Sequence, residues 1–126
     1  MLPTFNVPPI GPRQGKVWGT TQLAFAYNGT EAHAINVRKG GFCSRHSHTH
    51  KWNRFSVLSG KLIVRIYLNG GDEADSTIIG TGQSTDVPPG VRHEFEAAED
   101  TLAMEFYWVV LDVGDIDRHE TQGGIR

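Results

Sequence analysis

The chain has 126 residues, a mass of 13.9 kDa and a formal net charge of −2 at pH 7, which together indicate one globular domain. The near-neutral charge gives no reason to expect a nucleic acid or an anionic membrane surface as a partner. The single cysteine, Cys43, excludes an internal disulfide and a zinc site built from several cysteines. No apolar run reaches the roughly 18 residues of a membrane-spanning helix. Because the first residues lack the basic and apolar segments of a signal peptide, we expect a cytoplasmic protein.

Proline dominates the start of the chain. Four prolines fall within the first twelve residues: Pro3, Pro8, Pro9 and Pro12. Because proline fixes φ and removes a backbone donor, the sequence predicts an extended N-terminal arm over residues 1–15. We expect the folded domain over residues 16–111 and an irregular, polar C-terminal tail over residues 112–126.

Short segments separated by turn signals follow the arm. Asn28-Gly29 and Asn69-Gly70 are typical of two-residue hairpin turns, in which both positions need positive φ. Pro88-Pro89-Gly90 is typical of a further turn. The intervening segments are too short for ordinary helices and are rich in β-branched and aromatic residues. They predict strands near residues 17–27, 31–39, 42–49, 53–59, 61–68, 76–79, 83–87, 91–96 and 102–111.

The segment 91–96 alternates between two faces. Val91, His93 and Phe95 share one face, and the charged residues between them share the other. Many short strands joined by turns predict an all-β fold, either a sandwich or a closed barrel.

Residues 94–106 carry a competing signal, because the runs Ala97-Ala98-Glu99 and Ala103-Met104-Glu105 favour a helix. The strongly β-prone run that starts at Phe106 and the turn signal Glu99-Asp100 favour two strands instead. We therefore predict strand, turn and strand over this segment.

Three of the six histidines lie within five residues: His46, His48 and His50. On a strand, alternate residues point to the same face, with about 6.7 Å between neighbours on that face and about 13 Å between residues i and i+4. Since a metal–nitrogen bond is about 2.1 Å long, one ion would bind His46 with His48, or His48 with His50. Three alternating histidines favour a metal site over a solvated strand end.

The residues around this cluster follow the spacing of two known motifs. The first motif is matched by Gly40, His46, His48, Asn53 and Gly60, and the second by Gly82, Pro88, Gly90 and His93. Together the motifs cover residues 40–97. In the order and spacing of both motifs the chain resembles the cupin family. The resemblance implies a small single-domain cupin with an all-β fold, the antiparallel double-stranded β-helix, or jelly-roll barrel.

The resemblance also implies a metal site. In cupins the ligands are the two histidines and the glutamate of the first motif and the histidine of the second. Carried over by position, these are His46, His48 and His93, with Asn53 in place of the glutamate. An asparagine oxygen is a weak ligand without charge, and His50 is an alternative fourth ligand. Such a site suits one divalent transition ion, Zn, Fe, Ni or Co, better than Mg or Ca.

The function implied by the resemblance is that of a metal-binding small cupin that acts on or binds a small molecule in its barrel. If catalytic, it would be a three-histidine metal-dependent oxygenase or isomerase, with Glu105 and Tyr107 as candidate acid–base residues and Tyr67 as a further candidate. One alternative is a metal-independent sugar-nucleotide isomerase or epimerase. Another is a non-catalytic ligand-binding or structural barrel. The isolated histidines, His33 and His119, are expected at the surface or in the core.

We also expect a homodimer. Short cupins commonly pair, and the arm Met1 to Arg13 carries three apolar residues to bury against a neighbour: Phe5, Val7 and Ile10. Its prolines lower the entropy cost of ordering it.

Overall fold

The computed structural model describes residues 11, 13–68, 71–109, 115 and 125, and the regular structure within them consists of antiparallel strands. In chain order the strands are β1 (Arg13–Lys16), β2 (Gly19–Tyr27), β3 (Thr30–Val37), β4 (Trp52–Ser59), β5 (Lys61–Tyr67), β6 (Ala74–Gly80), β7 (Ser84–Val87), β8 (Arg92–Ala97) and β9 (Thr101–Trp108). None of the described segments forms a helix long and apolar enough to cross a membrane.

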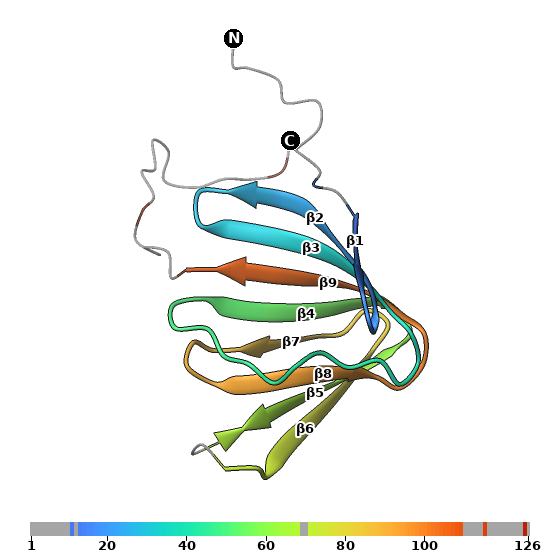
Figure 1. Cartoon of the computed structure of the whole chain (residues 1–126). Coiled ribbons are helices and arrows are strands. Elements are labelled where there is room, and N and C mark those ends of the chain that lie inside the picture. The colour runs from blue at the N-terminus through green and yellow to red at the C-terminus, as the bar shows by residue number, and fades with distance from the viewer. Residues whose placement is uncertain (1–10, 12, 69–70, 110–114, 116–124, 126) are drawn as a thin grey trace.

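The strands form two sheets (Figure 1). The larger has the order β1-β2-β3-β9-β4-β7, and the smaller has the order β6-β5-β8. Aromatic contact joins them, because the rings of Phe55 on β4 and Phe95 on β8 lie edge to face with centroids 5.9 Å apart. Around this pair the inner faces bury one core of aliphatic residues: Ile35, Val37, Val57, Leu62, Val64, Ile79, Val87, Ala97 and Ala103.

Several local predictions are confirmed. Asn28 and Gly29 close the β2–β3 hairpin with φ of 46° and 81°, as their turn signal requires. Residues 94–106 form strand, turn and strand, with β8 ending at Ala97 and β9 starting at Thr101. The alternation over 91–96 places His93 and Phe95 in the interior. The predicted turn at residues 69–70 lies outside the described residues.

The predicted strand over residues 42–49 is wrong. This segment is irregular and touches β8 through two isolated bridges, Phe42 with Glu96 and His46 with His93. The same-face alternation expected for the histidines therefore does not apply, because no continuous ladder keeps their side chains in register.

The start of the predicted strand over residues 17–27 differs from prediction. β1 begins at Arg13 and pairs with β2 through a tight turn at residues 17–18, where we predicted continuous strand. The turn is followed by Gly19, at which a Cβ atom would lie 1.8 Å from the backbone oxygen of Asn36, so the chain needs glycine there. Apart from Gly11, the predicted arm before Arg13 lies outside the described residues, as does most of the predicted tail, and the predicted domain limits stay predictions.

Candidate metal centre

Two isolated backbone contacts bring the histidine-rich loop against β8. His46 and His93 exchange both backbone hydrogen bonds, with N···O distances of 3.0 and 2.8 Å. Two residues further on, the oxygen of His48 accepts a hydrogen bond of 2.7 Å from the backbone N–H of Gly90. The loop is thus held by backbone hydrogen bonds at His46 and at His48. These bonds keep the two residues close together although neither lies on a strand.

The three histidines of the two motifs converge. One ring nitrogen from each of His46, His48 and His93 lies within 4.8 Å of the others. The ring centroids are 5.0 Å apart for His46 and His48 and 4.5 Å for His46 and His93. Bonds of about 2.1 Å from three imidazoles to one ion span such separations.

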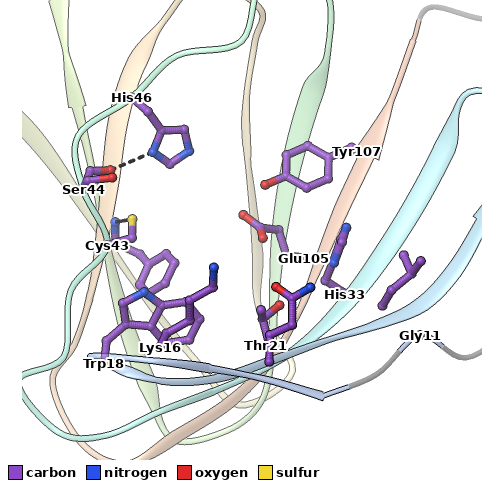
Figure 2. A pocket seen from close by; sticks show the side chains of 13 residues that line it. Gly11, Lys16, Trp18, Thr21, His33, Cys43, Ser44, His46, Glu105 and Tyr107 are labelled. Atoms are coloured by element: carbon purple, nitrogen blue, oxygen red, sulfur yellow. Dashed lines mark hydrogen bonds between the residues drawn. The ribbon is translucent and has the colours of Figure 1, made fainter.

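His46 and His48 each have a ring nitrogen that can bind a metal ion. Nδ1 of His46 lies 2.7 Å from the backbone oxygen of Ser44 (Figure 2). A carbonyl only accepts, so Nδ1 carries the proton and Nε2 keeps its lone pair. Nε2 of His48 is buried and has no hydrogen-bond partner among the described residues. A buried polar atom without a partner costs free energy, and a bound cation removes that cost.

His93 and Asn53 form the innermost part of the site. Nδ1 of His93 lies 2.9 Å from the oxygen of Val91, and its Nε2 lies 3.1 Å from Oδ1 of Asn53. The Asn53 side chain is oriented by Nδ2, which donates to the oxygen of Phe106 at 3.2 Å. Both partners of the His93 ring are therefore acceptors, but a neutral imidazole has only one N–H to donate.

The electrostatics keep His93 neutral. Burial, together with the neighbouring His46 and His48, lowers the pKa of His93 to about 4, against the hydrogen bond to Val91, which raises it. Burial also lowers the pKa of His48. At neutral pH the ring of His93 carries a single proton. If Nδ1 donates it to the oxygen of Val91, the lone pair of Nε2 faces a lone pair of Oδ1 of Asn53, which is unfavourable. A cation bound by Nε2 of His93 and Oδ1 of Asn53 would resolve this conflict, so the donor set fits a metal ion.

A cavity of about 560 Å³ opens beside the cluster. His46 lines it, and across from His46 stand Glu105 and Tyr107 of β9 (Figure 2). Glu105 is 9% exposed, and burial raises the pKa of its carboxyl group. Burial and the adjacent Glu105 raise the pKa of Tyr107 as well. Both candidate acid–base side chains thus face a common space with one of the histidines.

Other candidates lie elsewhere. His50 is exposed and lies outside the three-histidine cluster. The hydroxyl of Tyr67 donates to Glu94, and the guanidinium of Arg45 stacks 3.7 Å from the Tyr67 ring, so Tyr67 belongs to a polar group away from the cavity. Cys43 does line the cavity, and burial raises the pKa of its thiol to about 11, so the thiol stays protonated at neutral pH.

His33 is a cavity residue that the sequence did not single out for a role in the site. It pairs with Glu105 across β3 and β9 and lines the cavity. Its ring lies edge to face with Tyr107, with centroids 5.7 Å apart, and its Nε2 is 3.2 Å from a carboxylate oxygen of Glu31. Alternation along the segment 31–39 could have indicated that His33 faces the interior, because it places His33 on the same face as Ile35 and Val37.

Comparison with known proteins identifies a related family. A family model described as a cupin domain matches residues 34–110, a range that includes every residue of the cluster. The search of curated proteins gave no match.

Solved structures share the fold. KdgF from Halomonas sp. aligns with a TM-score of 0.68 and 16% identity over 80% of this chain and 88% of that one. An RmlC-like cupin from Shewanella frigidimarina aligns with a TM-score of 0.66 and 19% identity, covering 79% and 85%. An oxalate decarboxylase variant from Bacillus subtilis gives 0.69 and 14%, covering 84% of this chain and 31% of that one. At these identities the likeness concerns the jelly-roll fold.

Proposed function

This chain belongs to the cupin domain family, and on that premise we propose that it binds one divalent transition ion and acts on a small molecule in its cavity. The proposed ligands are Nε2 of His46, His48 and His93, with Oδ1 of Asn53 as a weak fourth donor. The observation that carries the proposal is the unpartnered, buried Nε2 of His48 within a cluster of three converging imidazoles. Nitrogen-rich, uncharged donors favour Zn, Fe, Ni or Co.

The cavity supplies the remaining groups for catalysis. When bound, the ion would act as a Lewis acid or bind O₂, as in metal-dependent isomerases and oxygenases. Glu105 is the group best placed to hold or move a proton, because its carboxyl faces the cavity and burial raises its pKa. Tyr107 stands beside Glu105 and, with its raised pKa, remains a hydrogen-bond donor at neutral pH.

A metal-independent isomerase is the second candidate function. The observation that favours it is the group formed by Glu105, Tyr107 and His33, which lines the cavity and contains an acid and a base without any ion. This alternative predicts turnover that survives removal of metal by a chelator, whereas the first proposal predicts its loss.

Metal analysis of protein purified without an affinity tag tests the proposal. We expect one transition ion per chain, or uptake of one on titration of the chelator-treated protein with Zn, Ni, Co or Fe(II). The His48→Ala variant should bind the ion at least about tenfold more weakly, since each lost histidine removes a strong donor. His50→Ala is the matched control, because His50 lies outside the cluster, and its affinity should match the wild type.

Absence of metal, together with no uptake of any of the four ions, would overturn the proposal. Equal losses in His48→Ala and His50→Ala would instead overturn the assigned ligand set. Ligand screening with and without chelator then separates the metal-dependent function from the metal-independent one and from a non-catalytic barrel.

We further propose a homodimer. The outer face of the larger sheet is mixed: the ion pair of Arg54 with Asp86 lies beside large apolar side chains, at positions where a monomeric antiparallel sheet usually carries polar residues. By the strand register this face includes Phe25 of β2, Ala32 of β3 and Phe106 of β9 in one row. A second copy of the chain would cover this face. The cytoplasmic location expected from the sequence stays a prediction.

A further inference from the structure

The end of the cavity opposite His46 is formed by the first hairpin, β1 and β2. Alternation along β1 places Gln14 and Lys16 on one face of the strand, and both line the cavity. Figure 2 shows the Lys16 side chain reaching into the space between Trp18 and Glu105. The cross-strand partner of Lys16 is Gly19, which has no side chain. Lys16 therefore has room to extend into the cavity.

Lys16 has no internal counter-ion in the described structure. The ion pairs found there involve His33, Arg45, Arg54 and Arg65, and none includes Lys16. Two arginines pair with carboxylates outside the cavity lining, Arg45 with Asp72 and Arg54 with Asp86. Within the described cavity lining, Lys16 is thus the cation whose charge is available to a ligand.

The proposed metal ligands add to this positive charge. The usual motif carboxylate is replaced by Asn53, so His46, His48, His93 and Asn53 are all neutral donors, and they would leave the charge of a divalent ion uncompensated. The acidic residue in the described lining is Glu105, which is 9% exposed. With an ion bound at the His46 end and Lys16 at the other, the cavity would attract a ligand with two negative groups.

We propose that the cavity selects small organic dianions, with one oxygen-donor acid group directed to the histidine cluster and a second carboxylate directed to Lys16. This inference rests on the proposed metal-binding function. The indole of Trp18, which lies edge to face with Phe95 at a centroid distance of 5.2 Å, forms part of the wall between the two ends, along with Leu23. Such a wall suits a short carbon chain between the two acid groups. Lys16 is accordingly a specificity-determining residue.

Two matched acids test the inference by calorimetry on Zn-loaded protein. (S)-2-Hydroxyglutarate and (S)-2-hydroxypentanoate have the same carbon chain and the same hydroxy-acid group, and they differ only in the distal carboxylate. We expect the wild type to bind hydroxyglutarate about fivefold more tightly, the effect of one ion pair at a partly solvated site. Lys16→Met should remove this preference and leave the affinity for hydroxypentanoate unchanged, while Lys16→Arg should keep the preference.

Lys61→Met is the control, because Lys61 is exposed on β5 and does not line the cavity. It should bind both acids as the wild type does. A preference that survives in Lys16→Met, equal affinities in the wild type, or binding of neither acid would overturn the inference. Elemental analysis of the same samples distinguishes failure of the proposed metal binding from failure of the proposed role of Lys16. Metal uptake without discrimination overturns the role of Lys16 alone, whereas failure to take up metal overturns the proposed function with it.

Discussion

Oδ1 of Asn53 on β4 lies 3.1 Å from Nε2 of His93 on β8, so one polar contact joins the two sheets at the bottom of the histidine cluster. Asn53 is 0% exposed and His93 is 1% exposed. Nδ1 of His93 faces the oxygen of Val91. When the ring is neutral and Nδ1 carries its proton, Nε2 has no proton to donate to Asn53. We therefore expect the residue at position 53 to influence the affinity of the proposed metal site.

Restoring the family's glutamate at this position should tighten metal binding. Asn53→Glu adds a negative charge beside the proposed ion, and we expect a gain of about tenfold or more in affinity, since attraction in contact exceeds the cost of desolvating the carboxylate. Asn53→Leu, which has the same number and branching of side-chain heavy atoms but no donor oxygen, should weaken binding. Competition with a chromogenic chelator measures both.

The same buried position limits the stability of the Asn53→Glu variant. An extra methylene in a fully buried site typically costs about 1–3 kcal/mol, and the hydrogen bond from Nδ2 of Asn53 to Phe106 is lost. The affinity is therefore compared only at temperatures where circular dichroism shows each variant folded. An unchanged dissociation constant in both variants would remove Asn53 from the ligand set and leave the three histidines.

The stability of the metal-free protein should rise with pH between about 4 and 6.5. The folded pKa of His93 is about 4, below the value of about 6.5 of a free histidine. Between these values the unfolded chain binds more protons than the folded one, so acid favours unfolding. The contribution of His93 is at most about 3 kcal/mol, fully present above pH 6.5 and lost as the pH falls to 4.

Urea unfolding of chelator-treated protein at several pH values measures this slope. His93→Gln, which cannot titrate, should flatten the dependence over the same range, while His50→Gln, at an exposed site, should leave it as in the wild type. A slope identical in all three proteins would show that His93 does not control the acid sensitivity.

Local signals predicted the strands and turns, whereas the jelly-roll fold and the grouping of His46, His48 and His93 came from the resemblance to the two cupin motifs. The hairpin at Asn28-Gly29 and the alternation around His93 follow from turn chemistry and from the pleat of a strand, both of which depend on neighbouring residues. The motif spacing identified His46 and His48 correctly as neighbours of His93. The grouping of the three histidines does not depend on a strand over residues 42–49, since that predicted strand is wrong and the histidines still converge.

The remaining features depend on contacts between distant segments. His46 is fixed by its bridge to His93, and Lys16 reaches the cavity because β1 folds back on β2. Neither contact leaves a periodic pattern in the chain. The turn at Val17-Trp18 also lacks the Asn-Gly or Asp-Gly signal of a typical hairpin, which is why β1 was assigned largely to the arm.

The motif glycines should differ in their tolerance of substitution. Gly60 joins β4 of one sheet to β5 of the other with φ of 103°, and a Cβ there would lie 2.5 Å from the oxygen of Asp100. Gly82 has φ of 81°, and a Cβ there would meet nothing within 4 Å. We expect Gly82→Ala to cost about 1–2 kcal/mol from backbone strain alone. Gly60→Ala should cost more, since a rigid backbone clash is added, and equal losses in urea unfolding would contradict this.

The outer face of the larger sheet leads to the last prediction. Phe25, Met104 and Phe106 lie on it by register, and Leu58 at its margin is 52% exposed. A stable dimer buries on the order of 800 Å² per partner, which a sheet of this breadth can offer. Light scattering at micromolar concentration should therefore give twice the 13.9 kDa mass of one chain.

Met104→Lys should shift the particle toward the monomer, because pairing would bury an uncompensated charge, while the volume-conserving Met104→Leu should remain dimeric. A wild-type particle of one chain would refute the dimer, and a dimer unaffected by Met104→Lys would move its interface to another surface.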